Sequence, residues 1–160
     1  MLKILYICTH NRCRSIMSEA ISNQDGGPEI QTRSAGSQPA GEVHPLTLKY
    51  LKEAGYNVDG LKSESWNEFN SFTPDIVVTV CDSAAQESCP LWLGDALQLN
   101  WELADPSSVK GTEEQKKWAF RNTIEMIKKR VQLVNENQHL TPDQFVQKLL
   151  GVGARLKTSD

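Results

Sequence analysis

Hydrophobic residues along the chain fall in short runs separated by polar segments, and the spacing within each run predicts its secondary structure. Continuous or alternating apolar runs predict strands at residues 2–7, 30–35 and 75–80, with a weaker strand near 96–100. The run 75–80 is rich in β-branched residues and apolar on both faces, which is typical of a buried parallel strand.

Apolar positions at helical spacing occupy the intervals between these strands. Helices are predicted from Ile16 to the Gly26–Gly27–Pro28 break, from Pro45 to Gly55, from the Thr112 cap to about Asn135, and from Pro142 through Leu149, with residues 63–72 an ambiguous stretch that allows a short helix. Because strands and helices alternate, the chain is predicted to be an α/β protein with a central parallel sheet of about four strands.

Composition narrows the class of protein. The 160 residues include 17 Lys and Arg against 20 Asp and Glu, a net charge of −3 without a long basic block, which argues against a nucleic-acid binder. The apolar run 2–7 is too short for a membrane span and lacks a following cleavage site, so we expect a cytoplasmic protein without a membrane partner. A chain of this length builds a core without disulfides, so the four cysteines require another explanation.

One polar segment carries distinctive chemistry. Residues 8–15 read Cys-Thr-His-Asn-Arg-Cys-Arg-Ser, a Cys-x5-Arg-Ser pattern between a predicted strand and a predicted helix N-terminus. Such a loop can turn its N–H groups inward around a tetrahedral oxyanion, with positive potential from the helix dipole and the Arg14 guanidinium. The same field is expected to lower the pKa of Cys8 and make it a nucleophilic thiolate. The candidate oxyanion-binding residues are Thr9, His10, Asn11, Arg12, Cys13, Arg14 and Ser15.

Two side chains of this loop have predicted supporting roles. Asn11 tolerates left-handed backbone and would hold the loop open, and Ser15 is positioned to hydrogen-bond the Cys8 sulfur. The plain alternative is that Cys8 is a small buried residue at a strand end and Arg14 a surface charge. The location between strand and helix favours the functional interpretation.

The positions of the cysteines favour a shared site at the ends of two strands over a zinc site. Cys8 and Cys81 each follow a predicted strand, and ligands of parallel sheets bind at the carboxyl ends of strands. A zinc site is the alternative, but neither Cys8 with Cys13 nor Cys81 with Cys89 has the tight spacing of a zinc knuckle. We therefore expect no zinc site and assign no metal ligand.

Several motifs together resemble known enzymes. Residues 8–15, 17–20 and 34–36 resemble the low-molecular-weight protein tyrosine phosphatases, which implies a three-layer sandwich. Residues 77–82, Cys89-Pro90, Trp101, Asp105-Pro106 and 111–114 resemble the thiol-coupled arsenate reductases built on that fold. The resemblance covers about residues 2–134 of a single domain spanning 1–160, and it leaves 135–160 as a C-terminal extension of unknown role.

The resemblance implies a role for each chemical residue. Cys8 would attack arsenic while Arg14 holds the oxyanion and Asp105 protonates the departing oxygen. Cys81 would then attack Cys8, which releases arsenite and leaves a Cys8–Cys81 disulfide, and Cys89 would attack Cys81 and carry the disulfide outward. Closing that last disulfide requires the intervening segment to rearrange if it is helical.

Two other functions remain alternatives. The loop suits a low-molecular-weight protein tyrosine phosphatase equally well, but Cys81 with Cys89 favours the reductase, and residues 107–110 lack the tyrosine pair that phosphatases commonly use. A non-catalytic oxyanion-binding or redox-sensing module is the third. Cys13 has no redox role in any of these.

The resemblance also implies partners. Arsenate would be the substrate with phosphate as its competitor, and an external thiol reductant, either thioredoxin or glutaredoxin with glutathione, would restore the thiols. No bound cofactor is expected. A chain of this size is expected to be a monomer.

Overall fold

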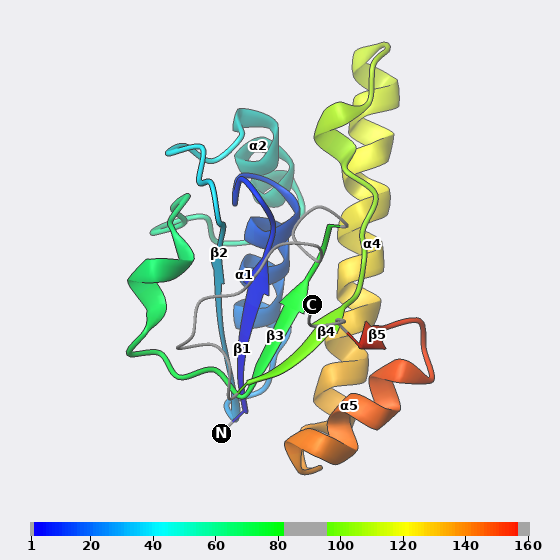
Figure 1. The fold of residues 1–160 in the computed structure, drawn as a ribbon. Coiled ribbons are helices and arrows are strands. Elements are labelled where there is room, and N and C mark those ends of the chain that lie inside the picture. Colours follow the sequence, from blue (N-terminus) through cyan, green and yellow to red (C-terminus); the bar gives the residue numbers. More distant parts are fainter. Residues whose placement is uncertain (1, 82–95, 157–160) are drawn as a thin grey trace.

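The computed structural model describes residues 2–81 and 96–156, which form a sheet with the strand order β2-β1-β3-β4-β5 (Figure 1). Its first four strands, all parallel, are β1 (Leu2–Ile7), β2 (Ile30–Ala35), β3 (Ile76–Thr79) and β4 (Leu97–Asn100). The predicted α/β class and its four parallel strands are confirmed. The short β5 (Arg155–Leu156), which pairs antiparallel with β4, is an addition that the sequence did not predict.

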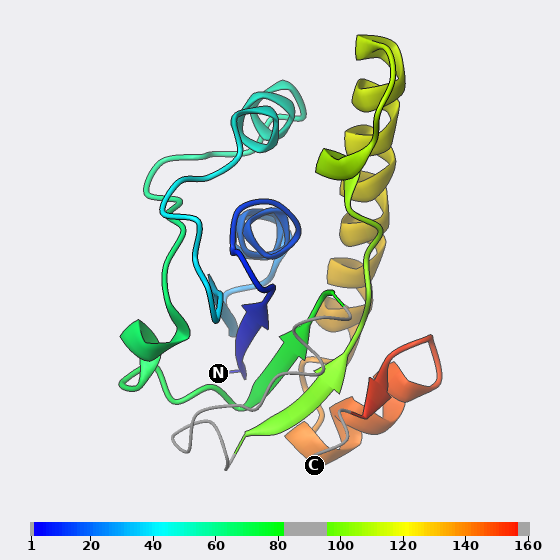
Figure 2. The same cartoon turned by 45° about the horizontal axis from the view of Figure 1, so that its top comes forward.

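Helices occur where apolar spacing predicted them. They are α1 (Arg14–Asp25), α2 (Pro45–Glu53), α4 (Glu113–Asn137) and α5 (Pro142–Leu150), with short 3-10 helices η1 (Trp66–Phe69) and η3 (Pro106–Ser108). Thr112 and Thr141 cap α4 and α5 with complete capping boxes, so the predicted Thr112 cap is confirmed. Helix α1 packs against β2 and α4, and Figure 2 shows α1 and α4 side by side next to the sheet.

The register of the two central strands creates the site. Strand β1 pairs with β3 so that Ile7 lies opposite Thr79, and the Val80 N–H donates to the Ile7 carbonyl at 2.9 Å. The residues that follow, Cys8 and Cys81, therefore emerge side by side at the carboxyl end of the sheet. Both are buried, as are the strands that carry them.

The C-terminal residues cover one edge of the sheet. Helix α5 contacts β4 and buries Phe145, Val146 and Leu149, and β5 pairs with the otherwise open side of β4. A paired edge is protected from pairing with other chains. Within the described ranges, no helix is both long enough and apolar enough to cross a membrane.

Candidate active site

The loop after β1 is a cradle of backbone N–H groups. The carbonyls of Thr9, His10 and Arg12 accept hydrogen bonds of 2.9 to 3.0 Å from backbone N–H groups in residues 38–44. The C=O and N–H of a trans peptide point in opposite directions, so the N–H groups next along the chain face the loop interior. Inward N–H groups at the start of a helix can bind an anion, and oxyanion binding by this loop stays a prediction.

Asn11 holds the cradle open from inside. Its φ of 45° is the left-handed conformation predicted for it, and its side chain is fully buried. The amide Nδ2 donates to Ser15 Oγ at 2.8 Å, and Oδ1 accepts from the Glu64 N–H at 2.8 Å. The side chain therefore ties the loop to α1 and to the segment before η1. The hydrogen bond from Ser15 to the Cys8 sulfur stays a prediction.

Gly36 lets a neighbouring segment pass close behind the loop. A Cβ at this position would lie 2.5 Å from the Thr9 carbonyl oxygen and 2.7 Å from that of Cys8. No side chain fits at such distances, so the close approach requires glycine here. The Gly36 N–H donates to the Glu64 carbonyl at 2.9 Å, which continues the support behind the cradle.

Arg14 and Asp105 stand together at the mouth of the cradle. Arg14 Nη2 lies 3.8 Å from Asp105 Oδ2, and its Nη1 donates to the Leu103 carbonyl at 3.1 Å. The other carboxylate oxygen of Asp105 accepts from the N–H of Ser107 at 3.0 Å and from its hydroxyl at 2.6 Å. Asp105 thus caps η3, and the structure places it beside Arg14, which the sequence alone could not establish.

The sulfur of Cys81 lies against that of Cys8, within hydrogen-bonding contact. Thr9 Oγ1 lies 3.8 Å from the Cys81 sulfur, which places the three side chains in one cluster. Cys89, the third cysteine of the predicted relay, lies outside the described residues, as does the segment between it and Cys81.

The predicted lowering of the Cys8 pKa is wrong for this arrangement. The hydrogen bond with Cys81 and burial raise the pKa of Cys8, and the negative charge of a Cys81 thiolate acts in the same direction. Arg14 and the His10 N–H do lower the pKa, as predicted, but they are outweighed. The proximity of Cys81 was expected from the strand pattern, but its effect on the Cys8 pKa, which exceeds that of the loop's positive field, was not.

A direct consequence is that removing the second sulfur frees the first to ionise. We expect Cys81→Ala to shift the ionisation of Cys8 to lower pH, because the largest cause of its raised pKa is gone. The pH dependence of alkylation by iodoacetamide, followed on the peptide that carries Cys8, measures this shift. Cys13→Ala is the matched control and should leave the Cys8 profile in place; an unshifted profile in Cys81→Ala would contradict the assignment.

Cys13 lies beside the cradle without joining the sulfur cluster. Burial raises its pKa to about 11, against smaller lowering effects from hydrogen bonds to Thr47 and Ser107. A thiol with this pKa stays protonated at neutral pH. The absence of a redox role for Cys13 stays a prediction.

His44 is a rim residue that the sequence did not single out. Its N–H donates to the Arg12 carbonyl at 2.9 Å, and its Nδ1 accepts from the Leu46 N–H at 3.1 Å as the cap of α2. Burial and the positive charge of Arg12 lower the pKa of His44, while Asp105 acts in the opposite direction. No residue pattern marked it, because its role depends on the turn that brings α2 to the loop.

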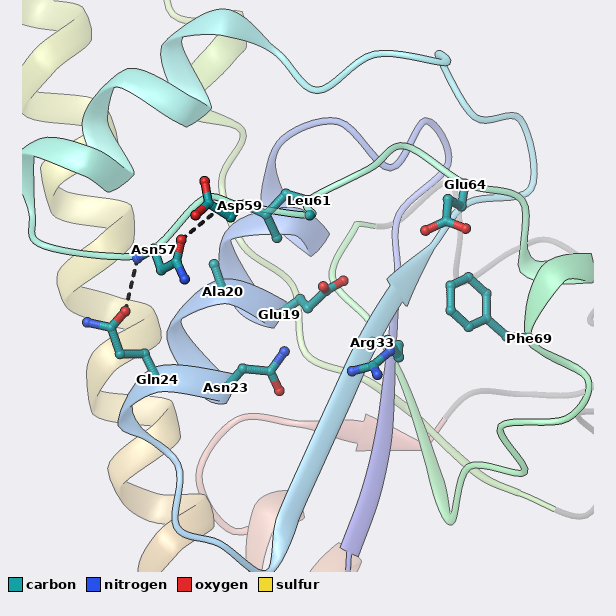
Figure 3. Close-up of a pocket in the computed structure, with 11 residues that line it drawn as sticks. Glu19, Ala20, Asn23, Gln24, Arg33, Asn57, Asp59, Leu61, Glu64 and Phe69 are labelled. Atoms are coloured by element: carbon teal, nitrogen blue, oxygen red, sulfur yellow. Dashed lines mark hydrogen bonds between the residues drawn. The ribbon is translucent and has the colours of Figure 1, made fainter.

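A cavity of about 660 Å³ lies behind the cradle rather than at its mouth. Figure 3 shows Glu19 of α1 and Arg33 of β2 facing it, with Glu64 beyond them. Burial raises the pKa of Glu19, and a 2.6 Å hydrogen bond from Ser34 opposes that effect. Side chains of both charge signs line this cavity, and Cys8 is not among its lining residues.

The sequence profile of the low molecular weight phosphotyrosine protein phosphatases matches residues 3–144. The chain belongs to this family. Within it, the chain is 33% identical over 133 residues to an arsenate reductase of Halalkalibacterium halodurans, covering 83% of this chain and 94% of that protein. It is 37% identical over 119 residues to an arsenate reductase of Bacillus subtilis, covering 74% of this chain and 84% of that protein.

Solved structures of family members agree with the fold. An arsenate reductase in a phosphate-binding state superposes with a TM-score of 0.70 at 27% identity, covering 86% of this chain and 98% of that one. A thioredoxin-dependent arsenate reductase of Corynebacterium glutamicum gives 0.59 at 29% identity, covering 83% and 63%. By sequence alone, the chain is also 28% identical over 132 residues to a glutaredoxin arsenate reductase of Synechocystis, which covers 82% of this chain and 95% of that protein.

Proposed function

We propose that this protein reduces arsenate to arsenite. Cys8 is the nucleophile that attacks arsenic, and Cys81 is the thiol that then attacks the sulfur of Cys8. The observation that carries the proposal is the hydrogen bond between the Cys8 and Cys81 thiols, at the start of a loop whose N–H groups can receive an oxyanion. A phosphatase needs one thiol there, whereas a reductase needs a second within reach of the first. The family members named arsenate reductase support the same reaction.

The first step forms a bond between sulfur and arsenic. The cradle N–H groups and Arg14 bind the oxygens of hydrogen arsenate, and Cys8 attacks the arsenic. One arsenic–oxygen bond breaks, and the departing oxygen leaves as water after taking a proton from Asp105. Because the pKa of Cys8 is raised, its own proton must also leave when it attacks, and the bound dianion or Asp105 accepts it. Arsenic remains pentavalent in this adduct.

The second step transfers two electrons. Cys81 attacks the sulfur of Cys8, a disulfide forms, and the electron pair of the breaking sulfur–arsenic bond passes to arsenic. Arsenic is thereby reduced to the trivalent state and leaves as arsenite, while the two cysteines are oxidised. The contact between the sulfurs keeps the motion required for this step small.

The third step moves the disulfide away from the cradle. Cys89 attacks Cys81, and Cys8 leaves as a thiolate that takes up the proton lost by Cys89, which restores the protonated Cys8 that begins the next cycle. An external dithiol or glutathione system then reduces the Cys81–Cys89 disulfide. Family members include both a thioredoxin-dependent and a glutaredoxin arsenate reductase, so either reductant is compatible with the chain.

The setting of the reaction follows from its chemistry. The relay requires reduced thiols at the start of each cycle, and the cytoplasm maintains them. We place the protein there as a monomer, with arsenate as substrate and phosphate as a competitor of the same shape and charge. No bound cofactor is required by the three steps.

Single-turnover arsenite release tests the proposal. Fully reduced protein mixed with excess arsenate and no external reductant should release one arsenite per chain. Cys81→Ser should release none, because the arsenic adduct has no thiol to resolve it, whereas Cys89→Ser should still complete one turnover.

The matched control is Cys13→Ser, which removes a buried thiol beside the same loop and should release arsenite like the wild type. Arsenite release by Cys81→Ser at the wild-type rate, together with rapid cleavage of aryl phosphates, would overturn the reductase proposal in favour of the phosphatase.

A further inference from the structure

The segment that carries Asp105 is tied down by an arginine from a distant helix. Residues 101–105 connect β4 to η3, and Arg130 of α4 reaches them from the side. Its Nη1 donates to the Trp101 carbonyl and its Nη2 to the Glu102 carbonyl, both at 2.6 Å. The guanidinium also lies 4.5 Å from the centroid of the Trp101 ring.

The same segment is anchored to the site on its other side. The N–H of Trp101 donates to the Thr79 carbonyl at 2.8 Å, and the N–H of Leu103 donates to the Val80 carbonyl at 2.9 Å. The Leu103 carbonyl then accepts from Arg14 at 3.1 Å. The backbone groups between β4 and Asp105 are therefore held alternately by the end of β3, by Arg130 and by the cradle arginine.

We propose that Arg130 is a positioning residue for Asp105: by holding the Trp101 and Glu102 carbonyls it sets where the carboxyl group stands relative to Arg14 and the cradle. The inference rests on the proposed role of Asp105 as the proton donor. None of the three contacts of Arg130 involves the cradle or Asp105, so its effect on Asp105 passes through residues 101–105.

Arginine suits this task for a geometric reason. Its planar fork reaches two successive carbonyls at once, and its flat face stacks on an indole ring. A lysine keeps the positive charge but offers a single donor head that cannot meet both carbonyls in the same way. Two charge-assisted hydrogen bonds to neighbouring peptides restrict rotation of the segment more than one contact does.

The Arg130 side chain is half-buried, which restricts its conformational freedom. Burial lowers its pKa to about 10, which still leaves it charged at neutral pH. Trp101 is buried beneath it, so the stacked pair forms a rigid base for the segment. A misplacement of about 1 Å at a reacting group costs on the order of 100-fold in rate, so a fixed base matters for proton donation.

A double-mutant cycle on single-turnover arsenite formation tests the inference. Asp105→Asn should slow this step by about 100-fold, the usual contribution of a general acid. Arg130→Lys and Arg130→Gln should each slow it by about tenfold, with the half-saturating arsenate concentration unchanged within about twofold. In the Asp105→Asn background, the Arg130 substitutions should have almost no further effect, because asparagine cannot donate the proton whose position Arg130 sets.

The possible results distinguish failure of the Arg130 role from failure of the proposed Asp105 role. If Asp105→Asn is slow but the Arg130 substitutions slow both backgrounds equally, Arg130 has only a structural role and the inference falls. If Asp105→Asn turns over like the wild type, the proposed acid is wrong and the inference falls with it. Urea denaturation of each variant shows whether it is folded, and Arg130→Lys preserves charge and length should Arg130→Gln fail to fold.

Arg121 supplies the matched control. It lies on the same helix but is exposed to solvent. Arg121→Lys should change neither the rate nor the half-saturating concentration. A tenfold loss in this variant would attribute the Arg130 effect to the helix as a whole and would overturn the specific role.

Discussion

Arg14→Lys is expected to reduce the kcat/KM for arsenate by roughly 100- to 1,000-fold. Lysine keeps the charge at the mouth of the cradle but loses the planar fork that pairs with two oxyanion oxygens. It also loses the hydrogen bond from Nη1 to the Leu103 carbonyl, which helps hold the Asp105 segment beside the site. Steady-state arsenate reduction with a saturating thiol reductant measures the effect.

Arg12 provides a stringent control for this substitution. It lies two residues earlier in the same loop, carries the same charge and is exposed at the rim. Because its backbone carbonyl rather than its side chain supports the cradle, Arg12→Lys should retain most of the activity. Retention of most of the activity in Arg14→Lys as well would show that loop charge, not the Arg14 fork, binds the oxyanion.

Gly36→Ala is the second substitution with a large expected effect. The added methyl group would meet the Thr9 and Cys8 carbonyl oxygens at 2.5 and 2.7 Å, so the cradle backbone has to move. Overpacking of this kind costs about 1 to 3 kcal/mol in the free energy of unfolding. A displaced cradle should also lower arsenate turnover by about 100-fold, because its N–H groups no longer converge on the oxyanion.

Gly27→Ala tests whether that effect is specific to the cradle. There the added Cβ meets the end of the Gln138 side chain at 3.3 Å, a flexible group far from the cradle loop. We expect small changes in stability and unchanged turnover, measured by urea denaturation and by the same arsenate assay. Normal turnover in Gly36→Ala would mean that the cradle does not depend on the close approach.

Local patterns were sufficient for the elements and for the position of the site. The apolar runs 2–7 and 30–35 match β1 and β2 residue for residue, because each strand is buried along its own length. Parallel strands align their carboxyl ends, so the proximity of Cys8 and Cys81 followed from the strand predictions alone. The left-handed conformation of Asn11 was predicted from residue type, since few other side chains tolerate it.

Features that depend on tertiary contacts escaped prediction. The two-residue β5 has no sequence pattern of its own and exists because β4 offers an open edge. The raised pKa of Cys8 depends on the sulfur of a residue 73 positions away, which outweighs the local field of the loop. Arg130 belongs to no motif in the sequence, and only the path of residues 101–105 past α4 gives it two carbonyls to bind.

Mapping the disulfide formed during a single turnover of Cys89→Ser tests the central claim most directly. The claim is that Cys81 resolves the arsenic adduct by attacking Cys8, and Cys89→Ser halts the relay at that point. Quenching by alkylation, followed by peptide mass spectrometry, should show one Cys8–Cys81 disulfide for each arsenite released, accumulating at the same rate. Arsenite release without that disulfide, or with a disulfide at Cys13 in its place, would contradict the mechanism.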